Sequence, residues 1–497
     1  MGEQSAQQDF DLAVIGGGPG GYVAAIRAGQ LGLRTALIEK ERAGGVCLNW
    51  GCIPTKAMLR SADVLETVQH AADYGVVVDK VGLDYSVVLK RKDKIVKTLT
   101  DGVAGLLKAS KVTVFGGHAR FTGPNTVEVV PTGDALLGAG GPLYNAPPAP
   151  DGKPTAVVSA REMIIATGST PARLPIPGID LPGVITSDGA FMLAEVPNRI
   201  IIVGGSAVGA EWASMFHAFG SEVTIVELLP SLVPLEDEEI GKTLGQSFKK
   251  RGINVQTART VAGIEQVDDG VLRVTTTKPD GGDEQTADAD VVLIGVGRKP
   301  NTAGLDPEKT GVTLDRRGFI EVDDQMRTSV GGLRAIGDVT GKVLLAHVAS
   351  HQGLVAVGNI AGHGERMDYK AVPAATFTHP EVASVGLSET GAKEAGYEVI
   401  SAKFPYTALG RAQTYGATEG FFKVVAEAKY REVLGVHIIG PAASDLIPEG
   451  TMTMAMEGTL DDIADTIHAH PTLGEGTMES AMVALGLPIH IPPPRRR

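Results

Sequence analysis

Two short runs of uninterrupted apolar residues stand out in the hydrophobic pattern of the chain. They lie at residues 12–15 (Leu-Ala-Val-Ile) and 200–203 (Ile-Ile-Ile-Val). A strand covered on both faces has this pattern, so each run predicts a buried strand of a parallel sheet. From Asp368 onward the pattern is first typical of strands and later of helices. The sequence therefore predicts α/β units followed by an α+β region.

The first run leads into a glycine-rich turn and then a second apolar run that ends at Glu39. Gly16, Gly18 and Gly21 have the G-x-G-x-x-G spacing. The first glycine makes the tight turn, the second lets the backbone approach a pyrophosphate, and the third lets the helix pack on the strand. A carboxylate at Glu39 can hold ribose hydroxyls. These residues predict a dinucleotide site with its phosphates at a helix N-terminus.

The second run is followed by the same arrangement at identical offsets. The repeated positions are Gly204, Ser206, Gly209 and Glu227. One such turn is a weak signal, whereas two matched units indicate an internal duplication and two nucleotide sites. Glu227 would repel a 2′-phosphate, and no Lys or Arg follows it before Lys242, which favours NAD over NADP. Ser206 replaces the middle glycine, and we expect it to crowd the pyrophosphate slightly.

The length of 497 residues is too great for one core and suggests about three domains. We divide the chain into a first nucleotide-binding domain at 1–195, a second at 196–297, a central region at 298–367 and a C-terminal domain at 368–497. The fold class predicted is α/β, with two Rossmann-like domains and a C-terminal α+β domain. The stretch from Pro131 to Pro154, rich in Gly, Pro and Ala, predicts a surface insertion between two strands. Residues 491–497 predict a flexible basic tail.

The charge balance narrows the classes of partner. The net charge is −13 and no basic stripe is present, which argues against nucleic acid and anionic membranes. No apolar run reaches the roughly 18 residues that a membrane span requires. Met1–Phe10 has no features of a targeting signal. We therefore expect a cytoplasmic protein.

The only two cysteines are Cys47 and Cys52. A structural disulfide framework uses more cysteines, and a metal site normally needs four ligands, so the pair indicates redox chemistry and no metal is expected. Residues from Cys52 to Arg60 suit the start of a helix, with Pro54 in the first turn. A helix N-terminus lowers a thiol pKa, which makes Cys52 the better thiolate. We expect Cys47 to lie on a loop and to be attacked from solution.

The segment from Gly44 to Lys56 (GGVCLNWGCIPTK) resembles the redox-active motif of the pyridine nucleotide–disulfide oxidoreductase family. Together with His470–Glu475 (HPTLGE), it is most similar to the dihydrolipoamide dehydrogenases of that family. The resemblance covers nearly the whole chain. It implies FAD in the first nucleotide domain, NAD in the second, and a homodimer formed through the C-terminal domain.

The resemblance also implies roles for further residues. On the FAD side it selects Thr167, Gly168, Gly337 and Asp338, in addition to the first glycine turn. On the NAD side it selects Gly297. Lys56 would sit beside the flavin and pair with Glu211, although two solvated helix charges are the alternative from the residues alone.

His470 has two interpretations. Thr472-x-x-Glu475 is a capping box for a C-terminal helix, in which Glu475 only satisfies a backbone donor. Alternatively, Glu475 orients His470 as a proton acceptor for a thiol. His468 is a second candidate, and the resemblance selects His470, contributed by the other subunit. His379, in a similar His-Pro-Glu sequence, is expected to be structural.

The predicted activity is FAD-dependent oxidation of a dihydrolipoyl group through a Cys47–Cys52 disulfide, with NAD as acceptor. The expected partner is the lipoyl domain of a 2-oxo acid dehydrogenase acyltransferase or of a glycine cleavage carrier protein. Two alternatives stay open: a glutathione reductase-like disulfide reductase, and a non-catalytic redox-sensing flavoprotein. A redox-sensing flavoprotein would be expected to lack one of the two cysteines or a member of the His470–Glu475 pair. All four residues are present.

Overall fold

The computed structural model describes residues 7–132 and 152–492. Its first sheet has seven strands in the order β3-β2-β1-β6-β5-β4, with β17 beside β6. The strands are β1 (Gln7–Ile15), β2 (Thr35–Glu39), β3 (Thr113–Gly116), β4 (His118–Gly123), β5 (Thr126–Val130), β6 (Ala156–Ile165) and β17 (Leu333–Ala335). Leu12, Ala13 and Val14 of β1 are fully buried, as the first apolar run predicts. β1 pairs in parallel with both β2 and β6.

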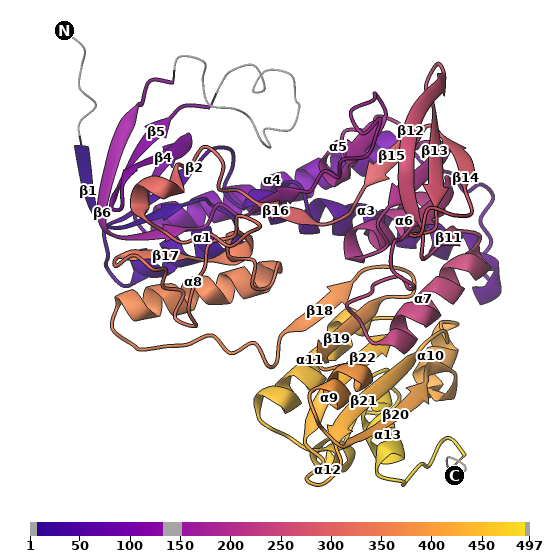
Figure 1. The fold of residues 1–497 in the computed structure, drawn as a ribbon. Helices are drawn as coiled ribbons and strands as arrows, with labels where there is room; N and C mark the ends of the chain where they lie inside the picture. The colour runs from indigo at the N-terminus through magenta and orange to yellow at the C-terminus, as the bar shows by residue number, and fades with distance from the viewer. Residues whose placement is uncertain (1–6, 133–151, 493–497) are drawn as a thin grey trace.

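The described helices of the first unit and of the central region come from distant parts of the chain. They are α1 (Pro19–Gln30), α2 (Gly45–Asn49), α3 (Cys52–Gln69), α4 (Tyr85–Ala109) and α8 (Ala346–Ile360), with the short 3-10 turns η1 (Ala71–Tyr74), η3 (Pro307–Thr310) and η4 (Gly337–Thr340). α1 and α8 lie against each other (Figure 1). The central region thus returns to the first sheet through β17 and α8.

The second sheet has five parallel strands in the order β11-β10-β9-β15-β8. The strands are β8 (Val184–Thr186), β9 (Arg199–Val203), β10 (Glu222–Val226), β11 (Asn254–Gln256) and β15 (Val291–Ile294), and the helices are α5 (Ser187–Ala190), α6 (Ala207–Ala218) and α7 (Glu238–Arg251). β8 precedes residue 196 yet forms an edge of this sheet. Two smaller sheets are also present. One consists of β12 (Thr260–Asp268), β13 (Val271–Thr277) and β14 (Gln285–Ala289). The other pairs β7 (Ser169–Pro171) with β16 (Arg298–Pro300).

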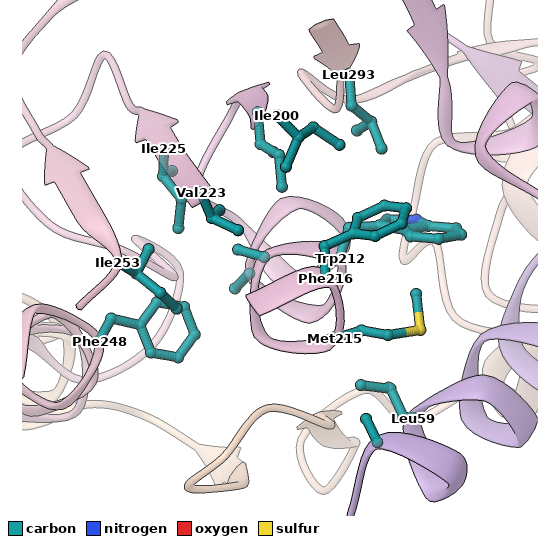
Figure 2. Close-up of a cluster of buried hydrophobic side chains, with 14 of the residues drawn as sticks. Leu59, Ile200, Trp212, Met215, Phe216, Val223, Ile225, Phe248, Ile253 and Leu293 are labelled. Atoms are coloured by element: carbon teal, nitrogen blue, oxygen red, sulfur yellow. The ribbon is translucent and has the colours of Figure 1, made fainter. Parts of the chain in front are cut away.

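The core of the second unit lies between this sheet and α6. Figure 2 shows Trp212 and Phe216 of α6 below Ile200 and Leu293 of the sheet. Met215 points the other way, toward Leu59 of α3 (Figure 2). Burial of large apolar side chains on both sides therefore fixes α3, which begins at Cys52, against the second nucleotide unit.

The C-terminal region is an antiparallel sheet in the order β18-β19-β22-β21-β20, with helices packed on it (Figure 1). The strands are β18 (Pro373–Thr376), β19 (Val382–Gly386), β20 (Val399–Pro405), β21 (Phe421–Glu427) and β22 (Val433–Ile439); the helices are α9 (Glu389–Glu394), α10 (Gly410–Tyr415), α11 (Ala443–Ala455), α12 (Leu460–Asp465) and α13 (Glu475–Ala484), with the 3-10 turn η5 (Tyr406–Ala408). The predicted fold class, α/β with two Rossmann-like units and a C-terminal α+β region, is confirmed.

Two predicted irregular segments lie partly outside the described residues. The insertion predicted at 131–154 joins β5 to β6, which pair antiparallel, and residues 133–151 are outside the described chain. The predicted flexible tail starts at Ile491, but Ile491 packs against the hydrophobic cluster of the C-terminal sheet. The prediction is wrong for Ile491 because its apolar side chain finds a buried surface; residues 493–497 are outside the described chain.

Candidate active site

The first glycine turn has the geometry that a nucleotide site requires. Gly16 follows β1 with φ +103°, and a Cβ on it would lie 2.3 Å from the carbonyl oxygen of Ala166. A Cβ on Gly21 would lie 1.8 Å from the carbonyl oxygen of Gly16. Side chains are therefore excluded at both positions. Gly18 is the N-cap of α1, so the positive end of that helix faces the turn.

The second turn has the same geometry. Gly204 has φ +104°, and a Cβ on Gly209 would lie 1.8 Å from the carbonyl oxygen of Gly204. Ser206 is the N-cap of α6, with φ −77° and ψ −172°, close to the −67° and −178° of Gly18. Its side chain makes no capping hydrogen bond. The serine leaves the backbone of the turn unchanged.

Each turn is closed by its glutamate. Glu39 Oε2 accepts a hydrogen bond from Gly17 N at 2.6 Å, and Glu227 Oε2 accepts one from Gly205 N at 2.6 Å. Burial raises the pKa of Glu39 above its usual value, partly offset by the Gly17 N–H bond. A carboxylate has about four acceptor positions, so each glutamate can still accept bonds from ribose hydroxyls.

A small cavity lies where β1 and β2 end, next to the first turn. Its volume is about 110 Å³, and Gly16, Glu39 and Thr167 line it. Thr167 Oγ1 is buried without a hydrogen-bond partner among the described residues. An unsatisfied buried hydroxyl is costly, and a bound polar ligand would satisfy it. The site therefore fits the dinucleotide cofactor that the turn predicts.

Asp338, in η4, is held by residues that the sequence did not single out. Ser169 Oγ donates to Asp338 Oδ2 at 2.5 Å, and Arg298 Nε lies 3.7 Å from the same oxygen. Gly337 N donates to Oε1 of Gln352 at 2.6 Å. Gln352 is completely buried in α8, and its Nε2 donates to Tyr369 Oη at 2.9 Å. No local sequence pattern marks these partners, because they come from separate segments.

Gly168 and Gly297 lie at the small sheet between the two units. Gly168 has φ +70° and precedes β7, and Gly297 has φ +115° and precedes β16. Ala172 N donates to the carbonyl oxygen of Gly297 at 2.8 Å. The contact of each glycine with a cofactor stays a prediction.

The cysteine pair lies at the start of α3. Cys52 is its first residue, as predicted, and Cys47 lies in the one-turn helix α2, so the predicted loop is wrong. Gly44 and Gly45, with positive φ, begin α2, and Asn49 Nδ2 donates to Gly45 O at 2.9 Å to close it. Cys52 is exposed and Cys47 half-buried, the reverse of the expected accessibility.

The electrostatics rank the two thiols as predicted. A hydrogen bond with Cys47 is the main factor that lowers the pKa of Cys52, to about 7, with the charge of Lys56 adding to it. The same hydrogen bond, together with burial, raises the pKa of Cys47. The directions of these shifts favour Cys52 over Cys47 as the thiolate of the pair.

Lys56 is anchored by two segments distant in the chain. Its Nζ lies 2.7 and 2.8 Å from the two oxygens of Glu211, which is buried in α6. Phe377, after β18, donates its backbone N–H to Glu211 at 2.9 Å and places its ring 4.5 Å from Lys56 Nζ. The two charges are not solvated helix charges, because Glu211 is 6% exposed. Phe377 was not predicted and has no sequence signal of its own.

His470 and Glu475 form a pair on the C-terminal region. His470 Nδ1 lies 2.8 Å from Glu475 Oε1, while Glu475 Oε2 accepts from Thr472 N at 2.8 Å. Glu475 thus both contacts His470 and satisfies a backbone donor, the two roles that the sequence left as alternatives. Gly474 rather than Thr472 is the N-cap of the helix. His470 is 76% exposed, and only Nδ1 has a partner among the described residues. Its Nε2 is the nitrogen that can exchange a proton.

The neighbouring histidines are engaged differently. His468 contacts Glu449 Oε1 through Nε2 and Thr466 O through Nδ1, both at 2.8 Å, so neither nitrogen is open. His379 Nδ1 lies 3.8 Å from Glu66 Oε2, and the His379 carbonyl oxygen accepts a hydrogen bond from Arg251. Both contacts support a structural role. These contacts favour His470 over both.

The structure therefore assembles the residues predicted for the thiol chemistry into two groups. The cysteines, Lys56 and Glu211 come together at the start of α3. α13, which carries Glu475, packs on β20, β21 and α12, and Figure 1 shows it well separated from α3 within one chain. One chain does not bring the two groups together.

Residues 7–132 and 152–492 contain neither a membrane-spanning helix nor a metal-binding cluster. No helix there is both long and apolar enough to cross a membrane. No group of three or more His, Cys, Asp or Glu side chains in the same residues is arranged to hold a metal ion.

Known proteins match this chain over most of its length. Residues 10–353 match the family described as pyridine nucleotide-disulphide oxidoreductase, and residues 372–481 match the dimerisation domain of that family. A dihydrolipoyl dehydrogenase of Chlamydia muridarum is 42% identical over 98% of this chain and 99% of its own. That of Geobacillus stearothermophilus is 43% identical, over 97% of this chain and 98% of its own.

Solved structures of related proteins also match this chain over most of its length. The Cu(II) complex of the HOCl-induced flavoprotein disulfide reductase RclA from Escherichia coli is 27% identical, with a TM-score of 0.83 over 96% of this chain and 99% of its own. LpdA from Mycobacterium tuberculosis is 26% identical, with a TM-score of 0.83 over 95% of this chain and 98% of its own. The chain therefore belongs to the pyridine nucleotide-disulphide oxidoreductase family.

Proposed function

We propose that this protein oxidises a dihydrolipoyl group to its cyclic disulfide and passes the electrons through FAD to NAD. The observation that carries the proposal is the cysteine pair at the start of α3, where Cys52 has a pKa of about 7 and Lys56 is fixed beside it by Glu211. Two dihydrolipoyl dehydrogenases match over nearly the whole chain, at 42% and 43% identity. Carboxylates at both nucleotide turns, with no nearby cation after Glu227, favour NAD over NADP.

The two nucleotide turns would hold the cofactors. Gly16, Gly18, Gly21 and Glu39 would bind FAD, with Asp338 at its ribityl end, and the second turn with Glu227 would bind NAD. FAD supplies the acceptor that takes an electron pair from a thiolate and delivers it as a hydride. Thr167 Oγ1, buried without a partner among the described residues, supports the assignment of the first site.

The chain's own residues account for the thiol chemistry. His470 Nε2 removes a proton from one substrate thiol while Glu475 holds Nδ1. The substrate thiolate attacks the Cys47 sulfur of a Cys47–Cys52 disulfide and expels Cys52 as a thiolate, because Cys52 has the lower thiol pKa and is the better leaving group. The second substrate thiol, losing its proton, then attacks the sulfur bound to Cys47. This closes the substrate disulfide, and Cys47 leaves and takes up a proton. The dithiol is oxidised by two electrons and the cysteine pair is reduced by two.

A complete site would then need two chains. His470 is exposed, its pair with Glu475 is separated from the cysteines of its own chain, and the C-terminal region matches a dimerisation domain. We therefore place His470 of one subunit opposite the cysteine pair of the other in a homodimer. The substrate would be the lipoyl domain of a 2-oxo acid dehydrogenase acyltransferase or of a glycine cleavage carrier protein.

A comparison of two substrate pairs tests the activity. The purified protein is assayed with dihydrolipoamide and NAD, and separately with NADPH and oxidised glutathione. We expect the first pair to react faster, because of Glu227 and the His470–Glu475 pair. Faster turnover of the second pair would mean that the protein is a glutathione reductase-like enzyme, and no turnover of either would support the redox-sensing alternative.

Replacement of His470 tests its role as the base. His470→Ala should lower kcat for dihydrolipoamide by about 100-fold or more, because general base catalysis contributes roughly 10²–10⁴-fold. FAD content, measured by absorbance, should not change. His363→Ala, at an exposed histidine beside Glu365, is the matched control and should keep full activity. Unchanged turnover in His470→Ala contradicts the assignment.

A further inference from the structure

The chain reverses direction after α13. Gly486 has φ +78°, its N–H donates to Val483 O at 3.0 Å, and Leu487 N donates to Met482 O at 2.8 Å. These two bonds form a Schellman motif, which ends the helix and turns the chain back. Ile491 then packs on the hydrophobic cluster of the C-terminal sheet. The segment between them carries His490.

His490 contacts a buried carboxylate on α13. Its Nδ1 lies 2.6 Å from Glu479 Oε1, and the Glu479 side chain is only 4% exposed. The other oxygen, Oε2, is buried with no hydrogen-bond partner among the described residues. Burial of a carboxylate is costly unless a hydrogen-bonded partner compensates it. His490 is the one ion-pair partner that the described chain provides.

Glu479 lies one helical turn after Glu475, so the two carboxylates share a face of α13. Burial raises the pKa of Glu475, but bonds from Thr472 and His470, together with the nearby charge of His490, lower it overall. Two histidine–carboxylate pairs are therefore adjacent on the first turns of this helix. Only the His470 pair is used by the proposed chemistry.

We propose that His490 is a positioning residue for the His470–Glu475 pair. Its bond to Glu479, one helical turn after Glu475, restrains the first half of α13, and this in turn holds the Glu475 carboxylate that contacts His470 Nδ1. The inference rests on the proposed function for the role of His470. Its geometric part, the fixing of α13 by the chain end, is independent of that role.

Three variants of the full-length dimeric holoenzyme test the inference. His490→Ala removes the bond to Glu479, and His490→Asn offers an amide N–H as a replacement for Nδ1–H. Ile489→Ala is the control, because Ile489 is the adjacent residue and is 67% exposed. Two activities are measured: dihydrolipoamide oxidation with NAD, and reduction of ferricyanide by NADH, which needs FAD but no base for a thiol.

His490→Ala should lower kcat for dihydrolipoamide about fivefold to tenfold and leave ferricyanide reduction unchanged. His490→Asn should restore more than half of the loss, and Ile489→Ala should behave as the wild type. Full dihydrolipoamide activity in His490→Ala overturns the inference. An equal loss in both assays also overturns it, because that result indicates general destabilisation.

Amide hydrogen exchange at residues 475–478 gives a readout that does not depend on the activity. Exchange there should be faster in His490→Ala than in the wild type and in Ile489→Ala, since the helix start is less restrained. Unchanged exchange overturns the inference. If the wild type does not oxidise dihydrolipoamide, the proposed function fails, whereas faster exchange in His490→Ala would still support the fixing of α13.

Discussion

The two glycine turns are nearly identical in geometry, but the segments after them differ. Gly16 and Gly204 have φ of +103° and +104°. In both turns the glutamate at the end of the next strand accepts the same backbone N–H at 2.6 Å. The local hydrogen bonding of a nucleotide site is thus preserved in both copies.

The segments after the two glutamates serve different purposes. After Glu39, Gly44 N donates to Gly17 O at 2.8 Å, and the chain continues into the cysteine pair. After Glu227, a backbone hydrogen bond again joins the chain to its own glycine turn. The chain then reaches Asp237, the N-cap of α7. Asp237 pairs with Lys423, a lysine of β21 whose side chain is 3% exposed.

Lys423 also lies 2.9 Å from Glu239 and 3.1 Å from Glu389. This network, buried at Lys423 and Asp237, connects the second nucleotide unit to the C-terminal sheet. The first copy of the turn therefore continues into the cysteine pair, and the second into an interdomain contact. Two units with the same turn can thus have different roles, because the segment after the turn differs.

The largest expected effect comes from a side chain placed inside either glycine turn. Gly21→Ala and Gly209→Ala both place a Cβ 1.8 Å from a backbone carbonyl oxygen. Relief of such a clash costs about 3 kcal/mol, or roughly 100-fold in affinity. Gly21→Ala should lose FAD, measured by absorbance of the purified protein. Gly209→Ala should keep FAD and raise the KM for NAD. Loss of FAD in both variants would contradict the separate assignment of the two sites.

Removal of Lys56 tests the cysteine segment, which follows only the first of the two turns. Lys56→Met should raise the pKa of Cys52 above about 7, because the positive charge that favours the thiolate is lost and the charge of Glu211 is left uncompensated. At neutral pH less Cys52 would then be ionised. Titration of thiolate absorbance in the reduced protein measures this shift. Lys97→Met, at an exposed lysine of α4, is the control and should leave the titration unchanged. A midpoint that stays the same in Lys56→Met would exclude this effect of Lys56.

The variant with the smallest expected effect gives the second turn the middle glycine of the first. Ser206→Gly should lower the KM for NAD about twofold to threefold, since the pyrophosphate can then approach the backbone more closely. In the reverse variant, Gly18→Ser, the new Cβ would lie 4.0 Å from its nearest neighbour, so the chain tolerates it and any loss of FAD reports contact with the cofactor. An unchanged KM in Ser206→Gly would show that the serine does not crowd NAD.

Features that depend on local backbone and short spacing could be predicted from the sequence. The two glycine turns, their glutamates and the helix that begins at Cys52 are of this kind, because each is specified by residues close together in the chain. The fold class followed from the same repeats. The short helix that holds Cys47 could not be predicted, since Gly44 at its N-cap and Gly45 at its first position suggest a loop.

The distant residues that support the chemistry became visible only in the folded chain. Gln352 holds Gly337, Phe377 holds Glu211 beside Lys56, and His490 holds Glu479. Each of these contacts joins segments that are brought together by burial of apolar surface elsewhere. Sequence spacing carries no record of such contacts, because the packing of whole sheets and helices determines them.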